Sequence, residues 1–430
     1  MNNDSAAMAI ADRVLKHVNA ERLESAVAEL ARFGGREDGG VSRQALTETE
    51  NQARRYLIDK AMGLGFEVQV DACANLFFRR HGLQDLSPVL TGSHIDTQPV
   101  GGKFDGAYGV VAGMEVLQAL EDAGVRTVRP VEVVIWTNEE GSRFNPGAMG
   151  SSSFVDPDRL PAYLRSIDVD GCLFGAALKT TLDEVTDITR REQKTPVAAF
   201  IEAHIEQGPK LEMEHAPLGV VTGIQGVRWY QVQCLGIAAH AGTTPMMVRR
   251  DAMTMAIEIA RQLNELASLS AYRDLRFTLG RWHVEPNSIN TIPGRVQFSI
   301  DARSVSGQVL DDFEQRLTEI VRSHPESNSI QHERIFERAS TPFPDDLQQL
   351  IETACGKAGG KPSVKLISGA FHDAMYLADH CPTSMLFVRS KDGISHNAAE
   401  YSDPHDLFLG TKALAYVVAT LACSPNSVCR

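Results

Sequence analysis

Short apolar runs alternate along the chain with segments in which apolar residues recur every three or four positions. The runs have the length and composition of buried strands and lie at residues 66–70, 88–91, 131–136 and 199–203. Residues 108–123, between two of these runs, carry apolar side chains at helical spacing. Strands that alternate with helices in this way predict an α/β domain with a mixed, mainly parallel sheet.

A second pattern begins near Thr222 and continues to about Ala339. Strand-like and helical segments follow one another at residues 228–237, 250–266, 295–301 and 309–322. The strand at 295–301 alternates apolar and polar positions, which is typical of a sheet with one exposed face. We therefore expect a small α+β domain inserted into the α/β domain.

The α/β pattern returns in the last part of the chain. It consists of a helix, a strand and a helix at residues 344–357, 383–388 and 405–422. The chain is thus expected to contain the first part of a catalytic domain, an inserted domain and the second part of the catalytic domain, at residues 1–221, 222–339 and 340–430.

Composition narrows the class of protein. A chain of 430 residues with 43% hydrophobic and 23% charged residues can bury a large core. We see no apolar run near the roughly 18 to 20 residues that a membrane helix needs, and no basic start followed by an apolar stretch. The seven cysteines are scattered and form no Cys-x-x-Cys pair, which favours a reducing cytoplasm. A net charge of −13 without a basic block argues against nucleic acid and for a small-molecule partner.

Histidines and acids lie where predicted strands end. His94, Glu139, Glu140 and His204 all fall at carboxyl ends of strands, where α/β sheets bind their ligands. Imidazoles and carboxylates are the usual ligands of zinc-like ions, and a pair of such ions supports hydrolysis. The adjacent Glu139 and Glu140 are interpreted as a general base beside a metal ligand, or as a solvated strand end.

Other candidates also have a plain structural interpretation. Asp105 lies in a glycine-rich turn, where it could bridge two ions or simply cap the turn. Asp96 could orient the second ring nitrogen of His94, or the two could form an ordinary loop contact. His396 and His372 both compete as a last ligand, and their spacing leaves both open.

Alternation along the strand at 199–203 would place Glu202, His204 and Glu206 on one face, as an acidic cluster that needs a cation. In the inserted segment, Arg303 could clamp a carboxylate or pair with Asp301.

Six segments of the chain, between about Ala20 and Ala422, resemble the zinc-dependent amidase, hydantoinase and carbamoylase branch of the aminoacylase and carboxypeptidase-like metallopeptidase family. They are Gly92-Ser-His-Ile-Asp96, Gly102-Lys-Phe-Asp-Gly-Ala-Tyr-Gly109, Trp136-Thr-Asn-Glu-Glu-Gly-Ser-Arg-Phe144, His204-Ile-Glu-Gln-Gly-Pro209, Ala239-His-Ala-Gly-Thr-Thr-Pro-Met246 and Lys391-Asp-Gly-Ile-Ser-His396.

The resemblance implies two divalent metal ions that share Asp105. One ion would be held by His94, Asp105 and His204, and the other by Asp105, Glu140 and His396. Zn²⁺ is the expected metal, with Mn²⁺, Co²⁺ or Ni²⁺ as alternatives.

The resemblance also implies Glu139 as general base, Asp96 behind His94, and a cis peptide after Asp105. His240 would assist catalysis by stabilising the oxyanion. The residues expected around the substrate are Gln207, His240, Asn290, Arg303, Gly369 and Ala370. The insert would serve as lid and dimerisation domain of a homodimer. Where the family commonly has glycine, this chain has Phe371, which should reshape the pocket.

The expected reaction is hydrolysis of the ureido C–N bond of an N-carbamoyl-L-amino acid to the amino acid, CO₂ and ammonia. Allantoate and N-carbamoyl-β-alanine are alternative substrates. Two further alternatives are a peptidase or N-acyl amino acid hydrolase, which His204 disfavours, and a non-catalytic binding protein, which the complete set of ligands disfavours.

Overall fold

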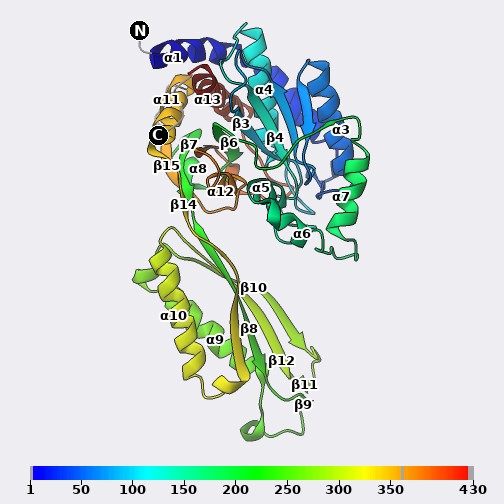
Figure 1. The fold of residues 1–430 in the computed structure, drawn as a ribbon. Coiled ribbons are helices and arrows are strands. Elements are labelled where there is room, and N and C mark those ends of the chain that lie inside the picture. Colours follow the sequence, from blue (N-terminus) through cyan, green and yellow to red (C-terminus); the bar gives the residue numbers. More distant parts are fainter. Residues whose placement is uncertain (1–2, 360–362, 425–430) are drawn as a thin grey trace. The chain divides into compact units, whose positions relative to one another are not determined.

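The chain forms two compact units (Figure 1). The computed structural model describes residues 3–359 and 363–424. The larger unit combines Met1–Gly223 with Phe343–Arg430, and the smaller unit is Ile224–Pro342. The larger unit is therefore discontinuous along the sequence. The roles expected for the smaller unit, as lid and dimerisation domain, stay predictions.

A mixed sheet forms the centre of the larger unit. Its strands lie in the order β7-β16-β6-β3-β4-β2-β1-β5, with β15 beside β7. Their bounds are β1 (Glu67–Val70), β2 (Leu76–Arg80), β3 (Val89–His94), β4 (Val131–Trp136), β5 (Thr189–Arg190), β6 (Ala199–Ile205), β7 (Leu218–Ile224), β15 (Val364–Ser368) and β16 (Thr383–Val388). Strands β4, β3, β6 and β16 are parallel to their neighbours in this series, whereas β2 and β7 run antiparallel to β4 and β16. The predicted α/β class with a mixed sheet is confirmed.

The carboxyl ends of the four parallel strands β3, β4, β6 and β16 lie at one edge of the sheet. They are buried along their whole length, as continuous apolar runs covered on both faces should be. His94, the last residue of β3, lies opposite Trp136, the last residue of β4, and His204 lies opposite Phe387. The loops that follow β3, β4, β6 and β16 therefore start from neighbouring points.

Helices surround this sheet. Their bounds are α1 (Asn3–Val14), α2 (Ala20–Leu30), α3 (Glu48–Gly63), α4 (Ala107–Asp122), α5 (Met149–Val155), α6 (Leu160–Tyr163), α7 (Phe174–Asp183), α8 (Lys210–Met213), α11 (Asp345–Gly359), α12 (Ala374–Leu377) and α13 (Pro404–Cys423). Helix α4 packs against β3, β6 and α13, and residues of α4, from Ala107 to Leu120, are almost all buried. A central helix of this kind holds the loop before it, residues 95–106, in a fixed position.

Helix α13 is more apolar than the sequence analysis allowed. The helix has 20 residues, and a window of 18 of them has a mean hydropathy of 1.4, so by length and composition alone it would suffice to cross a membrane. The helix is not a continuous apolar run, because Asp406 and Lys412 interrupt it. In the structure 89% of this segment is buried inside the protein, where it contacts α1, α4, α11 and the strands β6 and β16. It is a core helix of the larger unit.

The smaller unit is a layer of helices on an antiparallel sheet. The sheet has the strand order β10-β12-β8-β13, and α9 and α10 pack on one side of it (Figure 1). The elements are β8 (Gly226–Leu235), β9 (Ala239–His240), α9 (Ala252–Ala267), β10 (Arg276–Glu285), β11 (Thr291–Ile292), β12 (Arg295–Ser304), α10 (Gly307–Ser323), β13 (Ile330–Arg338) and β14 (Thr341–Pro342). Strand β12 alternates half-buried and buried positions along its whole length, so one face of the sheet carries polar side chains.

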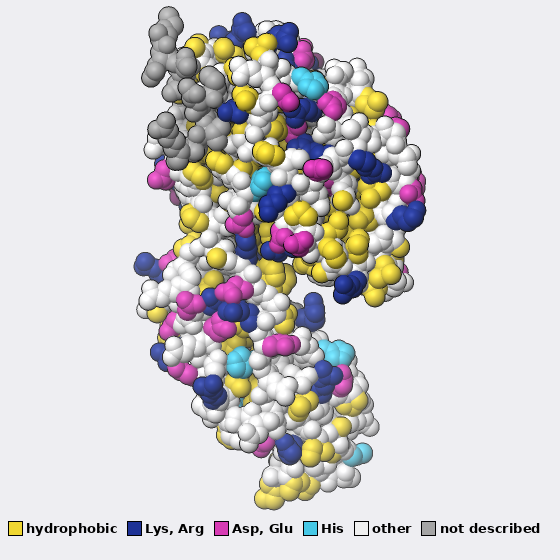
Figure 2. All heavy atoms as spheres, in the orientation of Figure 1, with side chains coloured by type: hydrophobic (Ala, Val, Ile, Leu, Met, Phe, Trp, Pro, Cys, Tyr) yellow, Lys and Arg dark blue, Asp and Glu magenta, His cyan; other side chains and the backbone are white. Residues whose placement is uncertain are grey.

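Charges of both signs are interspersed over the face of the molecule seen in Figure 2. In the smaller unit, Arg228 contacts Asp311, Glu314 and Glu337 at 2.6 to 3.1 Å. Arg334 contacts two of the same acids. Arg228 and Arg334 are thus paired with acids of the same unit.

Candidate metal centre

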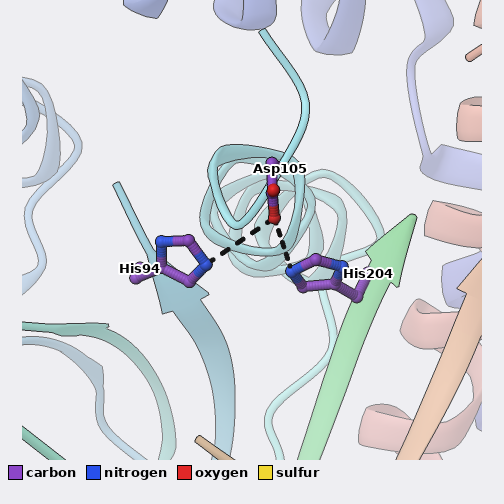
Figure 3. A group of neighbouring side chains, drawn as sticks. All are labelled: His94, Asp105 and His204. Atoms are coloured by element: carbon purple, nitrogen blue, oxygen red, sulfur yellow. Dashed lines mark ion pairs between the residues drawn. The ribbon is translucent and has the colours of Figure 1, made fainter. Parts of the chain in front are cut away.

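Asp105 lies at the centre of a cluster of imidazoles and carboxylates in the larger unit. It belongs to the loop between β3 and α4, while His94 and His204 lie at the ends of β3 and β6. Asp105 Oδ1 is 3.2 Å from His204 Nε2 and 3.9 Å from His94 Nε2 (Figure 3). All three residues are buried, and their potential ligand atoms lie within 4.8 Å of one another. They could hold one metal ion.

The other oxygen of Asp105 faces a second group. Its Oδ2 atom is 3.2 Å from His396 Nε2, and that nitrogen is 3.3 Å from Glu140 Oε2. Asp105, Glu140 and His396 also have potential ligand atoms within 4.8 Å of one another. The two groups therefore share one carboxylate, as a pair of bridged metal ions would require.

The donor atoms suit divalent transition metals. Three imidazole nitrogens and two carboxylates form a nitrogen and oxygen set that zinc and its neighbours accept. Glu140 Oε1 and Gln207 Oε1 are buried and have no hydrogen-bond partner within the protein. Buried polar atoms are rarely left unpaired, so these oxygens are consistent with a ligand at this place.

Protonation shows how strongly the cluster attracts positive charge. Burial would raise the pKa of Asp105, but contacts with His204 and His396 outweigh burial and hold it well below its usual range. Burial lowers the pKa of His204, but the hydrogen bond to Asp105 and the charges of Asp105 and Glu202 together outweigh burial and raise that pKa to about 9. The same carboxylate raises the pKa of His396 to about 9. Without a cation, protons on these imidazoles supply the positive charge that a metal would supply.

Two of the imidazoles are oriented by main-chain oxygens. His94 Nδ1 is 2.9 Å from the carbonyl oxygen of Asp96, and His204 Nδ1 is 2.9 Å from that of Ile205. A carbonyl oxygen accepts only, so both Nδ1 atoms carry the proton. Each neutral ring would then present the lone pair of Nε2 to the centre of the cluster.

The carboxylate of Asp96 holds a neighbouring turn. It accepts hydrogen bonds from the backbone N–H groups of Glu139 and Glu140, at 3.1 and 3.2 Å. Its distance to His94 Nδ1 is 3.6 Å, longer than that of its own carbonyl oxygen. Burial raises the pKa of Asp96 to about 7. Asp96 thus orients His94 through its carbonyl oxygen and holds the turn after β4 through its carboxylate.

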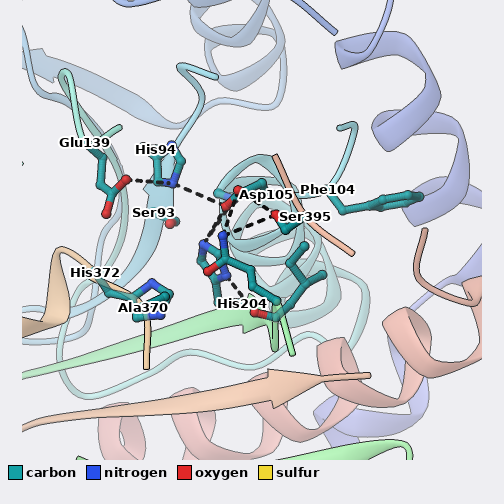
Figure 4. A network of polar contacts seen from close by, with 12 residues as sticks. Ser93, His94, Phe104, Asp105, Glu139, His204, Ala370, His372 and Ser395 are labelled. Carbon is teal, nitrogen blue, oxygen red and sulfur yellow. Dashed lines mark hydrogen bonds and ion pairs between the residues drawn. The ribbon is translucent and has the colours of Figure 1, made fainter. Parts of the chain in front are cut away.

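Glu139 points toward His94 from this turn (Figure 4). Its Oε2 atom is 3.4 Å from His94 Nε2, and the residue is only 7% exposed. Burial, followed by the charges of Asp373 and Glu140, raises the pKa of the Glu139 carboxyl well above its usual value. A carboxyl group with a raised pKa beside the cluster is suited to accept and return a proton near neutral pH.

The peptide bond after Asp105 is trans. The cis bonds in the described residues precede Pro146 and Pro286, so the expected cis peptide was wrong. The chain turns instead at Gly106, whose φ is +62°. A Cβ atom at Gly106 would lie 2.4 Å from the ring of His94. Glycine at this position allows both the positive φ and the close approach of the His94 ring.

The acidic cluster predicted on β6 is only partly formed. Glu202 is buried and accepts hydrogen bonds from Ser93 Oγ and the backbone N–H of Ala374. Glu206 accepts instead from the backbone N–H groups at the start of α8. Strand β6 ends at Ile205, so the alternation that was extended to Glu206 no longer applies there.

The two histidines that competed as a last ligand lie in different places. His396 faces Asp105 and Glu140. His372 packs against His204 with ring centroids 4.5 Å apart, and its Nε2 is 2.9 Å from Ser368 Oγ. Glu202, His204 and His372 form a further group of possible ligands, but Glu202 and His372 are already occupied by protein contacts.

Gln207 reaches the same centre. Its Nε2 atom donates to Asp105 Oδ2 at 2.8 Å and lies 3.5 Å from His396 Nε2. Gly369 is exposed and Ala370 is half-buried, in the segment just before His372.

Phe371, in the same segment, is half-buried, and its ring packs at 5.9 Å from that of Tyr376.

The remaining expected substrate residues belong to the smaller unit. His240 and Asn290 lie together, because β9 pairs with β11 and the backbone N–H of Ala241 donates to the Asn290 carbonyl. Arg303 lies on β12, where its guanidinium contacts both oxygens of Asp301. The ion pair considered for Arg303 from the sequence is therefore present.

Three residues near the cluster were not singled out from the sequence. Gln98 Nε2 donates to Glu140 Oε2 at 2.7 Å. Ser395 and Glu400 lie beside Asp105. The short spacing of Ser395, His396 and Glu400 was a usable signal, because a polar residue next to a ligand often orients it.

Comparison with known proteins identifies similar chains. A profile of peptidase family M20/M25/M40 matches residues 90–420. The chain is 37% identical over 409 residues to an N-carbamoyl-L-amino acid amidohydrolase of Geobacillus stearothermophilus, covering 94% of this chain and 99% of the relative. It is 35% identical to an allantoate amidohydrolase of Bacillus subtilis, covering 91% and 95%. A hydantoinase/carbamoylase family amidase of Burkholderia vietnamiensis superimposes with a TM-score of 0.85 at 40% identity, covering 95% and 98%.

Proposed function

Because the chain belongs to peptidase family M20/M25/M40, we propose that it is a binuclear-metal amidohydrolase that cleaves the ureido C–N bond of an N-carbamoyl-L-amino acid. It is a hydrolase whose relatives act on carbon–nitrogen bonds other than peptide bonds. The observation that carries the proposal is the sharing of Asp105 by two groups of ligands, with Glu139 3.4 Å from His94.

The two metal positions follow from these groups. His94, Asp105 and His204 would hold one ion, and Asp105, Glu140 and His396 the other. Zn²⁺ fits the donor set, and Mn²⁺, Co²⁺ and Ni²⁺ would compete for it. Bound ions would polarise the ureido carbonyl and lower the pKa of a water molecule.

Glu139 would handle the proton. It takes a proton from the attacking water, and the oxygen adds to the carbonyl carbon of R–NH–CO–NH₂. Glu139 then gives that proton to the nitrogen of the amino acid as its bond to carbon breaks. The carbamate that remains decomposes to CO₂ and ammonia. His240 would donate to the developing oxyanion.

The substrate carboxylate would be bound by the planar guanidinium of Arg303, which matches a carboxylate with two parallel hydrogen bonds. Gln207, Asn290, Gly369 and Ala370 are assigned to the rest of the substrate. Because His240, Asn290 and Arg303 all belong to the smaller unit, we also assign to it the roles of lid and dimerisation domain in a homodimer.

A reducing cytoplasm suits this protein. Six cysteines among the described residues are free thiols, and five of them are buried. Nothing in their arrangement depends on oxidation.

Allantoate is the second candidate substrate. It also joins a carboxylate to ureido groups, and the relative from Bacillus subtilis supports it. N-carbamoyl-β-alanine would place the carboxylate one carbon further from the ureido group. A non-catalytic binding protein is disfavoured because the chain keeps all five ligand side chains and Glu139.

A substrate panel with metal analysis tests the proposal. N-carbamoyl-L-amino acids, N-carbamoyl-β-alanine, allantoate, an N-acyl amino acid and a dipeptide are assayed, by ammonia release or by released amine, with each metal. We expect two ions per chain and the highest kcat/KM with an N-carbamoyl-L-amino acid. A preference for allantoate would select the second candidate. Absence of bound metal and of turnover on every compound would refute an amidohydrolase.

A further inference from the structure

Glu400 is a buried carboxylate that contacts the main chain of Asp105. It is 5% exposed and lies four residues after His396. Its Oε1 atom accepts hydrogen bonds from the backbone N–H groups of Phe104 and Asp105, at 2.9 and 3.1 Å. These contacts join two loops that are almost three hundred residues apart in the sequence.

The second oxygen of Glu400 reaches the side chain of Asp105 through a serine. Ser395 Oγ is 3.0 Å from Asp105 Oδ2 (Figure 4). The same Ser395 Oγ is 2.8 Å from Glu400 Oε2. Ser395 directly precedes His396, whose Nε2 is 3.2 Å from the same Asp105 oxygen. Glu400 therefore contacts both the loop that carries Asp105 and the loop that carries His396.

The loop before α4 has space for this carboxylate only because residue 102 is glycine. A Cβ atom on Gly102 would lie 2.0 Å from Glu400 Oε1 and 2.1 Å from its carboxyl carbon. Burying a second carboxylate close to Asp105 costs desolvation free energy. The hydrogen bonds from two backbone N–H groups and one hydroxyl offset part of that cost.

We propose that Glu400 is a positioning residue that fixes the loop of Asp105 to the loop of His396, so that both ligands face one metal position before the ion binds. Glu400 itself contacts neither metal nor substrate. The inference rests on the proposed metal pair. The metal position that depends on Glu400 is the one formed by Asp105, Glu140 and His396.

The test measures Zn²⁺ binding to the metal-free full-length protein by calorimetric titration, with bound zinc counted by elemental analysis. In Glu400→Ala the affinity for one of two ions should fall roughly 10- to 100-fold, the usual effect of removing a group that orients a ligand. Glu400→Gln should bind zinc nearly as the unaltered protein does. Its amide oxygen still accepts from both N–H groups, and its NH₂ group can donate to Ser395, which then donates to Asp105.

A second variant, Gly102→Ala, changes the loop of Asp105 instead of Glu400 itself. Gly102→Ala keeps the Glu400 carboxylate but fills the space that it occupies. The substitution should therefore lower the affinity for the same ion as Glu400→Ala does. Asp251→Ala is the matched control. Asp251 also accepts from two backbone N–H groups, those of Met253 and Thr254, but it caps α9 in the smaller unit. It should lower thermal stability without changing zinc affinity.

The outcomes separate the two proposals. Unaltered protein that binds no zinc overturns the metal pair, and the role of Glu400 with it. Two tightly bound ions in both Glu400→Ala and Gly102→Ala would leave the metal pair standing and overturn the role of Glu400. Equal losses in Glu400→Gln and Glu400→Ala would show that the charge of Glu400 matters rather than its geometry, and would overturn positioning.

Discussion

The guanidinium of Arg303 is paired with the carboxylate of Asp301, two residues earlier on the same face of β12. Arg303 Nε is 3.0 and 3.1 Å from the two carboxylate oxygens, and Nη2 is 2.8 Å from one of them. A substrate carboxylate that binds Arg303 would replace or share this internal partner. The pair thus holds the guanidinium in a defined orientation while the substrate is absent.

Arg303→Lys should raise KM for N-carbamoyl amino acids roughly 10- to 100-fold, because a lysine cannot make the two parallel hydrogen bonds of a guanidinium. The kcat for a neutral urea of similar size should change little. Steady-state kinetics on both substrates checks this. Arg295→Lys is the control, since Arg295 lies on the same face of β12 but contacts Gln233, Gln297 and Glu285. An equal effect of both substitutions would contradict the role of Arg303.

Glu139→Gln should lower kcat by roughly 10²- to 10⁴-fold, because the amide has no carboxylate to accept the proton of water. The content of bound metal should stay the same, since Glu139 belongs to neither group of ligands. Ammonia release and elemental analysis of the same sample measure both quantities. Activity near that of the unaltered protein would disprove the assignment of the base.

Asp96→Ala should lower kcat roughly 10- to 100-fold. The substitution keeps the carbonyl oxygen that orients His94 and removes the carboxylate that holds the N–H groups of Glu139 and Glu140. The expected loss therefore lies in kcat and in affinity for the ion near Glu140, whereas the ion near His94 should bind unchanged. A loss of affinity for the ion near His94, with unchanged affinity for the ion near Glu140, would contradict these separate roles of the carbonyl oxygen and the carboxylate.

Phe371→Gly should increase the preference for large over small side chains of the N-carbamoyl amino acid by roughly tenfold or more, the scale on which pocket volume changes selectivity. Phe371 is half-buried against Tyr376 and directly precedes His372. The measurement is the ratio of kcat/KM for N-carbamoyl-phenylalanine and N-carbamoyl-alanine. Phe371→Leu, which keeps most of the volume, should leave this ratio nearly unchanged. No change in the glycine variant would place Phe371 outside the pocket.

Removal of metal should make stability depend on pH. The pKa values of His204 and His396 are raised from 6.5 to about 9 in the metal-free fold. A raised histidine pKa stabilises the fold fully below the unfolded value and loses this effect as pH rises through the folded value. The melting temperature of chelated protein should therefore fall between about pH 6.5 and 9.

Metal-loaded protein should not show this decrease, because an ion in place of the protons keeps the cluster neutralised. Zinc affinity should rise with pH over the same range, since the ion displaces protons. Differential scanning calorimetry of both forms at several pH values is the measurement. Parallel pH profiles of the chelated and loaded forms would contradict the linkage to His204 and His396.

Sequence patterns predicted the strands whose own residues determine their conformation. Strand β4 was predicted over Val131–Trp136, the same residues that the structure shows, because a continuous apolar run leaves little choice. Strands β10 and β13 were not predicted. Both are mostly exposed and carry no apolar run, and the alternation in β10 is interrupted by a bulge between Leu279 and Trp282.

The candidate site shows the same limit. The ligand side chains stood in recognisable short motifs, whereas the contact between Glu400 and Asp105 depends on the folded chain. No local pattern relates residues so far apart in sequence. The error at Glu206 has a similar cause, because its carboxylate accepts from N–H groups at the start of α8, a contact that alternation along β6 does not indicate.

Helix α13 has a consequence for the order in which the protein forms during synthesis. It fills the core of the larger unit beside α4 and β6, yet it leaves the ribosome only after both of these elements and the whole smaller unit have been made. The part of the larger unit that precedes the smaller unit in the sequence therefore keeps apolar surface uncovered while the smaller unit is synthesised. Nascent chains of this architecture should need chaperone protection over that interval, and the metal centre can assemble only when His396 has emerged.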